Sequence, residues 1–150
     1  MHVLSMALLA GVQHMKNHKR ADIKPAGDEF VRSVDLLTGD NEKFHQLGHI
    51  VDNLLKSKIP GYADEPGKLS IQCNYNQRMN KHIDKINLGH SYIFAVGDYS
   101  DGELQVYDGD QPIDYDIRSK ILKFDGQTPH GVARIGSGVR ISFVVYRRNA

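Results

Sequence analysis

The sequence predicts an α+β fold in which a jelly-roll barrel of short strands packs against N-terminal helices. Two observations support this prediction. In the first part of the chain apolar residues recur at helical spacing, whereas after residue 67 the pattern changes to short strand-like runs. Turn signals separate these runs, namely Asp-Gly pairs at 101–102, 108–109 and 125–126 and a Gly-Ser-Gly segment at 136–138.

The N-terminal part is expected to be helical. The apolar run at residues 3–12 is too short to span a bilayer, so we expect a helix docked on the surface, followed by a basic stretch at residues 16–24. Residues 28–57 are also expected to be helical, because apolar side chains recur there in two stripes. The first stripe is Phe30, Val34 and Leu37, and the second is Phe44, Leu47, Val51, Leu54 and Leu55.

The remaining chain is expected to form the barrel. Strands are predicted at residues 69–73, 91–96, 103–107, 121–124, 130–134 and 139–146, with a further candidate at 112–115. A chain of 150 residues is expected to be one domain. We divide it into an N-terminal helical support region, residues 1–67, and a jelly-roll core, residues 68–150.

Composition and charge bound the environment and the partners. Hydrophobic residues make up 40% and charged residues 25% of the chain, as in ordinary soluble proteins, and no membrane association is expected. A formal charge of +1 argues against broad attraction to nucleic acid. The segment 98–116 holds seven acids and no Lys or Arg, so a polyanion is not expected to cross it. Cys73 is the single cysteine, which favours a reducing, intracellular compartment, cytoplasmic or nuclear.

Two histidines, an aspartate and an arginine in the second half of the chain suggest an iron site. His82 and Asp84 follow the strand-like run at 69–73, His130 begins a later strand and Arg140 lies in the last one. Two imidazoles and one carboxylate can occupy three adjacent positions of an octahedral metal and leave the others open, as in non-haem Fe(II) oxygenases. The arginine offers a planar fork for the far carboxylate of a dicarboxylic acid.

Other interpretations of single residues stay open at this point. Arg134 or Lys123 could provide the carboxylate clamp from a neighbouring strand in place of Arg140. His45 and His49 stand four apart on the second expected helix, a spacing that can bind zinc. No glutamate follows His45 as in zinc proteases and no third ligand is near, so ordinary helix residues are the better interpretation.

The order of several motifs resembles the core of the Fe(II)- and 2-oxoglutarate-dependent dioxygenases, whose barrel is a double-stranded β-helix of the cupin type. Within that superfamily the chain is most similar to the TET and J-binding-protein group, which oxidises the 5-methyl of a pyrimidine base. The motifs cover residues 74–142 and include Asn74-Tyr75-Asn76, His82-Ile83-Asp84, Asn87, Ser91-Tyr92, Gly97-Asp98-Tyr99, Gly102-Glu103-Leu104, Phe124-Asp125-Gly126, Pro129-His130-Gly131 and Gly138-Val139-Arg140-Ile141-Ser142.

The resemblance implies a role for each of the matched residues. His82, Asp84 and His130 correspond to the metal triad, and Arg140 corresponds to the arginine that pairs with 2-oxoglutarate. Fe(II), 2-oxoglutarate and O2 are the implied cofactor and co-substrates, with ascorbate as an additional candidate. The other residues expected near the co-substrate or the substrate are Ser142, Asn74, Tyr75, Asn76, Asn87 and Tyr92, without a choice among the three residues 74–76.

Three classes of function compete. The leading one is a dioxygenase that hydroxylates a C–H bond, the 5-methyl of a pyrimidine in DNA or in a nucleoside. The second is a dioxygenase of a peptide side chain, as in prolyl hydroxylases, or of an alkylated base, as in AlkB-type enzymes. The third is a metal-binding barrel without catalysis. No obligate protein partner is expected, and no long insertion that would grip a duplex and hold an extruded base is visible.

Overall fold

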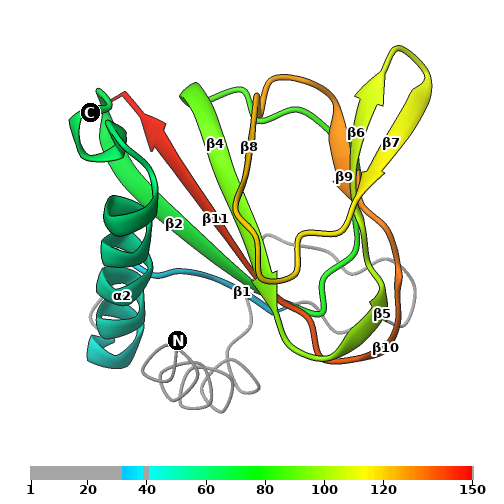
Figure 1. Cartoon of the computed structure of the whole chain (residues 1–150), viewed down its shortest axis with the longest axis horizontal. Helices are drawn as coiled ribbons and strands as arrows, with labels where there is room; N and C mark the ends of the chain where they lie inside the picture. The colour runs from blue at the N-terminus through cyan, green and yellow to red at the C-terminus, as the bar shows by residue number, and fades with distance from the viewer. Residues whose placement is uncertain (1–31, 39–40, 150) are drawn as a thin grey trace.

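The computed structural model describes residues 32–38 and 41–149 (Figure 1). The surface helix expected at 3–12 and the basic stretch at 16–24 lie outside the described residues. Among the described residues no helix is long and apolar enough to cross a membrane.

A five-stranded antiparallel sheet forms the centre of the structure. Its strands are β1 (Arg32–Asp35), β2 (Lys68–Tyr75), β4 (Asn87–Val96), β8 (Leu122–Phe124) and β11 (Ile141–Arg148). Their order is β1-β2-β11-β4-β8, so the last strand of the chain lies between two early ones. This register places Ser142 opposite Asn74 on one side and opposite Ala95 on the other.

A second, four-stranded sheet faces the first and gives the barrel its other wall (Figure 1). Its order is β3-β9-β6-β7, from β3 (Met79–His82), β9 (His130–Val132), β6 (Leu104–Asp108) and β7 (Gln111–Tyr115). A two-stranded sheet of β5 (Tyr99–Asp101) and β10 (Ile135–Gly138) lies at one end of the barrel.

One helix, α2 (Glu42–Lys58), covers the outer face of the five-stranded sheet (Figure 1). It begins at Asn41, whose side chain accepts hydrogen bonds from the backbone N–H groups of Lys43 and Phe44 at 3.0 and 3.3 Å. Its buried face matches the predicted apolar stripe and includes Phe44, Leu47, Val51 and Leu55. A short 3-10 helix, η1 (Tyr62–Asp64), follows it.

Alternation along the central strands separates two apolar clusters. On the helix side, Ile71, Cys73, Phe94, Phe143 and Val145 pack with the buried face of α2. On the barrel side, a second cluster joins the sheets and includes Ile93, Ala95, Leu104, Phe124 and Val132. Because side chains of a strand alternate between its faces, the same strands supply both clusters.

The structure confirms the barrel and corrects three local predictions. Residues 32–35 form β1 and not a helix, because their backbone pairs with residues 72–75 of β2. Residues 136–138 belong to β10 and not to a turn, because β10 pairs with β5. The strand expected at 130–134 ends at Val132. Short strands β3 and β5 were not predicted.

Candidate metal centre and co-substrate pocket

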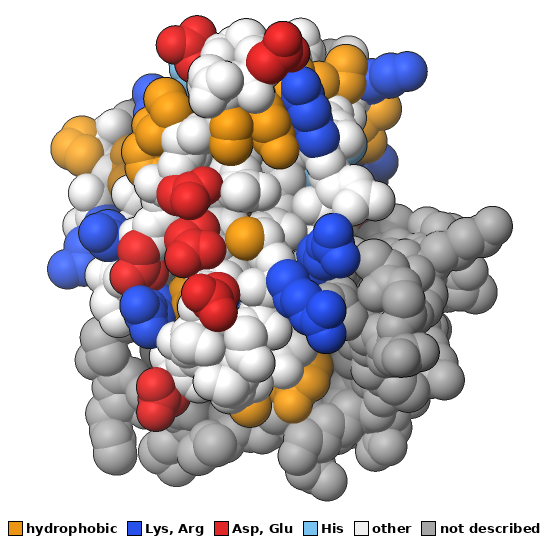
Figure 2. All heavy atoms as spheres, turned by 90° about the vertical axis from the view of Figure 1, so that its right-hand side faces the viewer, with side chains coloured by type: hydrophobic (Ala, Val, Ile, Leu, Met, Phe, Trp, Pro, Cys, Tyr) orange, Lys and Arg blue, Asp and Glu red, His pale blue; other side chains and the backbone are white. Residues whose placement is uncertain are grey.

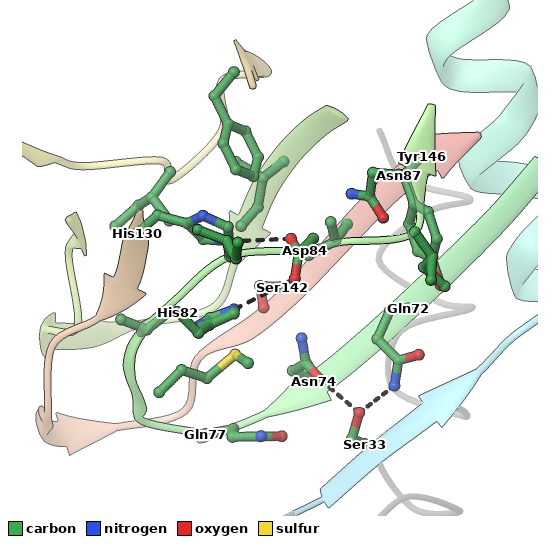
Figure 3. Close-up of a pocket in the computed structure, with 18 of the residues that line it drawn as sticks. Ser33, Gln72, Asn74, Gln77, His82, Asp84, Asn87, His130, Ser142 and Tyr146 are labelled. Atoms are coloured by element: carbon green, nitrogen blue, oxygen red, sulfur yellow. Dashed lines mark hydrogen bonds and ion pairs between the residues drawn. The ribbon is translucent and has the colours of Figure 1, made fainter. Parts of the chain in front are cut away.

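His82, Asp84 and His130 meet at one point of the barrel wall (Figure 3). His82 ends β3 and His130 begins β9, and the two are opposite each other in the register of these paired strands. One ligand atom from each of the three side chains lies within 4.8 Å of the others. Asp84 Oδ2 is 3.1 Å from His130 Nε2, and Asp84 Oδ1 is 3.5 Å from His82 Nε2.

Backbone carbonyls orient both imidazole rings. His82 Nδ1 donates to the carbonyl of Asn80 and His130 Nδ1 donates to the carbonyl of Thr128, each at 2.7 Å. A carbonyl can only accept, so the proton on each ring sits on Nδ1 and Nε2 is turned toward Asp84. Once Nε2 gives up its own proton, each ring would offer a cation one nitrogen lone pair beside the carboxylate, while the carbonyl on Nδ1 keeps the ring oriented, as is usual for metal-binding histidines.

The carboxylate of Asp84 is held charged at this point. Burial alone would raise the pKa of Asp84, but hydrogen bonds with His130 and His82 outweigh it and hold the pKa well below its usual range. The hydrogen bond with Asp84 raises the pKa of His82. The backbone N–H of Asp84 donates to the carbonyl of Gly126 at 2.8 Å, which fixes the loop after β3.

Arg140 lies between β10 and β11 and is only 1% exposed. Its Nε and Nη2 have no hydrogen-bond partner among the described residues. Burial lowers the pKa of Arg140, and the ring of Tyr99 lies 5.8 Å from its Cζ. Two buried guanidinium nitrogens without an acceptor are costly, so the observation favours an anionic ligand at this place.

A cavity of about 450 Å³ connects these groups. The three candidate metal ligands line one wall. Arg140, Ser142 and Val144 line another, which confirms that these three alternate residues, the first just before β11, share one face. Asn74 and Gln72 of β2 and Ser33 of β1 extend the polar lining (Figure 3). A volume of this size is typical of small-molecule sites.

Several predicted site residues reach the cavity and others do not. Asn74, Asn87 and Ser142 line it. Asn76 does not; it adopts a φ of 46° and its Oδ1 accepts the backbone N–H of Arg140 at 2.6 Å, so it shapes the approach to β11. Tyr75 packs against the apolar cluster on the helix side of the sheet.

The expectation for Tyr92 needs correction. Its neighbour Ile93 belongs to the barrel-side cluster, so strand alternation turns Tyr92 to the helix side. There its hydroxyl donates to Glu65 at 3.0 Å and its ring meets that of Tyr62 edge-on. Tyr92 therefore belongs to the apolar cluster under α2 and not to the cavity.

The structure also decides between Arg140 and the other two candidates for the carboxylate clamp, and it bears on the His45 and His49 pair. Lys123 and Arg134 are exposed and neither lines the cavity, which leaves Arg140 as the buried cation there. Among the described residues His45 and His49 belong to no cluster of metal-ligating side chains.

Four of the uncharged polar residues in the lining were not anticipated, namely Ser33, Gln72, Gln77 and Tyr146. Gln72 and Tyr146 could have been found by alternation, because they lie two positions from Asn74 and two from Val144. Ser33 could not, since its segment was assigned to a helix. Gln77 is 5% exposed and its Oε1 has no hydrogen-bond partner among the described residues.

Comparisons of the whole fold identify the class of barrel. No family model matches the chain, and no curated protein matches it. A Pseudomonas putida prolyl-4-hydroxylase superposes with a TM-score of 0.61 over 97% of this chain and 87% of that chain, at 17% sequence identity. A 2OG-Fe(II) oxygenase family oxidoreductase from Burkholderia pseudomallei gives a TM-score of 0.62 over 93% and 78%, at 13% identity.

A viral collagen prolyl hydroxylase from Paramecium Bursaria Chlorella virus-1, solved as a 2OG complex, superposes with a TM-score of 0.59 over 97% of this chain and 91% of that chain, at 12% identity. The chain therefore has the fold of the 2-oxoglutarate- and Fe(II)-dependent oxygenases. The narrower resemblance to the TET group gains nothing from the comparison. A TET protein in complex with 5mC DNA reaches a TM-score of 0.47 over 69% of this chain, and that likeness carries no argument.

Proposed function

We propose that the protein is an Fe(II)- and 2-oxoglutarate-dependent dioxygenase that hydroxylates a C–H bond. One observation carries the proposal: a His-Asp-His cluster and a buried arginine, with Nε and Nη2 unpartnered among the described residues, line the same cavity. A metal-binding barrel without catalysis would explain the cluster, but it would leave the arginine without a ligand. The fold shared with 2-oxoglutarate-dependent oxygenases supports the same conclusion.

The donor set fits Fe(II). His82 and His130 would bind it through Nε2 and Asp84 through its carboxylate, with the Nδ1 protons fixed by carbonyls. Bound iron supplies the redox chemistry that couples decarboxylation of 2-oxoglutarate by O2, giving succinate and CO2, to hydroxylation of a substrate. Three protein ligands leave positions for a bidentate 2-oxo acid and for O2. Ascorbate would serve as a reductant in turnovers without substrate.

The residues near Arg140 suit the co-substrate. The guanidinium would pair with the distal carboxylate of 2-oxoglutarate through two parallel hydrogen bonds. The Ser142 hydroxyl, two residues further along the same face, and the Asn74 amide opposite it in register would contact the molecule between Arg140 and the metal. The protein's contribution is to orient the 2-oxo acid and to exclude water from the buried end.

For the substrate we propose the 5-methyl of a pyrimidine base, in DNA or as a nucleoside. The motif order supports it, and so does the uncharged polar lining that is left once the metal and the diacid are placed. Three amides remain there, on Gln72, Gln77 and Asn87. Amides both donate and accept, as the edge of a base requires.

Nucleic acid would have to approach away from the segment 98–116. All its aspartates are exposed, and Figure 2 shows acidic side chains gathered on the face that carries this segment. Like charges would repel phosphates there. A peptide side chain is the second candidate, supported by the prolyl hydroxylases among the structures with this fold.

Succinate release tests the function. Purified protein with Fe(II), 2-oxoglutarate and O2 is offered methylated DNA, unmethylated DNA, thymidine and a pool of proline-containing peptides, and succinate is measured in each. We expect release that depends on His82 and rises with thymidine or DNA. Stimulation by peptides alone would overturn the pyrimidine assignment, and no decarboxylation under any condition would overturn the oxygenase.

A further inference from the structure

Ser33 connects the N-terminal strand to the cavity. It lies on β1, at the edge of the five-stranded sheet, opposite Asn74 of β2. Its side chain is 1% exposed and lines the cavity, on the wall away from the three candidate metal ligands (Figure 3). A buried hydroxyl in such a place needs hydrogen-bond partners from the wall itself.

The hydroxyl of Ser33 bridges two amides. It accepts a hydrogen bond from Gln72 Nε2 and donates to Asn74 Oδ1, the latter at 2.7 Å. A hydroxyl has one hydrogen to donate, and the donation from Gln72 leaves that hydrogen for Asn74. The bridge therefore has a direction, from Gln72 through Ser33 to Asn74.

The direction decides what Asn74 offers to the cavity. Its oxygen is engaged by Ser33, and its nitrogen points toward Ser142 and Asp84 (Figure 3). Asn74 is 7% exposed and lines the cavity beside the path from Arg140 to the metal cluster. The wall thus presents N–H donors at this place and no acceptor from Asn74.

We propose that Ser33 is a positioning residue that holds Asn74 as a hydrogen-bond donor to a ligand oxygen beside the metal site. The inference rests on the proposed function, because that oxygen belongs either to 2-oxoglutarate or to a carbonyl of the substrate. Without the hydroxyl the Asn74 amide can rotate by half a turn and direct its own oxygen at the ligand. Two acceptors would then face each other, and binding would weaken.

The experiment compares Ser33→Thr with Ser33→Val. These side chains have nearly the same shape and both favour strands, so any effect of the added methyl groups on folding is shared and the hydroxyl is the difference. Dissociation constants are measured by calorimetry without O2, first for Fe(II), then for 2-oxoglutarate on the Fe(II)-loaded protein, and then for thymidine on the ternary complex. Fe(II) affinity should be the same in both variants.

We expect Ser33→Val to bind one of the two ligands about three- to tenfold more weakly than Ser33→Thr, the ratio expected for one buried neutral hydrogen bond. Weaker 2-oxoglutarate binding would assign the oxygen to the co-substrate, and weaker thymidine binding alone would assign it to the substrate. Equal affinities of the two variants for both ligands would overturn the proposal.

A double-mutant cycle shows whether Ser33 acts through Asn74. Ser33→Thr and Ser33→Val are repeated in an Asn74→Leu background, where no donor is left to orient. The difference between them should disappear. A difference that persists there would mean a purely structural role and would overturn the inference. Failure of the wild-type protein to bind 2-oxoglutarate would instead count against the proposed function itself.

Discussion

The two faces of the five-stranded sheet use the same strands for opposite purposes. The helix side, under α2, is filled by apolar side chains that pack against one another. Phe94 and Phe143, for example, are stacked with their ring centroids 5.1 Å apart. Buried polar atoms without partners among the described residues occur on both sides, on His45 and Glu65 near the helix and on Arg140 and Gln77 in the barrel, but only Arg140 and Gln77 line the cavity. The comparison indicates that one face stabilises the fold while the other keeps binding groups ready at a cost in stability.

The largest effect on stability should come from the helix side. Phe143 is fully buried there, and Phe143→Ala would leave a void between β11 and α2. We expect the free energy of unfolding to fall by about 3–5 kcal/mol, measured by chemical denaturation. Below its unfolding transition the variant should still bind Fe(II). Loss of Fe(II) affinity in the folded variant would show that the two faces are not independent.

The cavity side should respond in the opposite sense. In Arg140→Met a buried guanidinium with two unpartnered nitrogens is replaced by an apolar chain, so stability should be unchanged or should rise by about 1 kcal/mol. Affinity for 2-oxoglutarate should fall about 100-fold, because a charge-assisted pair is lost. Calorimetry and denaturation measure the two quantities.

Lys123→Met is the matched control, since Lys123 is exposed and away from the cavity. It should bind 2-oxoglutarate as the wild type does. A marked loss of stability in Arg140→Met would contradict the interpretation of Arg140 as a residue kept for a ligand.

A smaller effect is expected at Gly126, behind the metal cluster. A Cβ at this position would lie 2.8 Å from Asn87 Nδ2 and 3.2 Å from Asp84 Oδ2. Gly126→Ala should therefore displace the carboxylate and weaken Fe(II) binding about tenfold, as changes just outside a metal site do.

Gly109→Ala is the comparison for Gly126→Ala, because a Cβ at Gly109 meets nothing within 4 Å. Its left-handed φ of 62° makes that variant less stable, but its Fe(II) affinity should not change. Equal Fe(II) affinity in Gly126→Ala and the wild type would mean that Asp84 has room to move.

The smallest effect concerns pH on the helix side. Burial, together with the hydrogen bond to Glu65, raises the pKa of Tyr92 from 10.0 to about 12. The folded state thus favours the neutral phenol, so this stabilisation is complete below the unfolded pKa and is lost as the pH rises toward about 12. Tyr92→Phe should flatten the fall in unfolding free energy across that interval. An unchanged slope would exclude Tyr92 as its source.

Sequence patterns predicted the structure correctly where the hydrophobic periodicity of a segment agrees with its long-range contacts. The stripe of α2 and the alternation of β11 predicted which side chains are buried, and alternation placed Arg140 and Ser142 on one face. Motif spacing brought the histidines and Asp84 together as candidates, and the structure shows that their ligand atoms meet. Their assignment as iron ligands stays a prediction, as does the division of the chain at residue 67.

Sequence patterns failed where the conformation of a segment is set by pairing with a strand far along the chain. Val34 and Leu37 have helical spacing, yet residues 32–35 pair with β2, and no local signal announces that strand. Because that strand was not predicted, the position of Ser33 in the cavity lining was not predicted either. Tyr92 was misplaced because its position in the matched motifs suggested the cavity, although alternation with Ile93 already turned it away.

The central claim is that the barrel side of the sheet joins a metal and a diacid in one cavity. Adding 2-oxoglutarate to the Fe(II)-loaded protein without O2 and recording the visible absorption spectrum tests it most directly. We predict a weak charge-transfer band that is absent in His82→Ala and reduced in Arg140→Ala. A protein that binds zinc tetrahedrally at these residues and shows no spectral or thermal response to 2-oxoglutarate would contradict the claim.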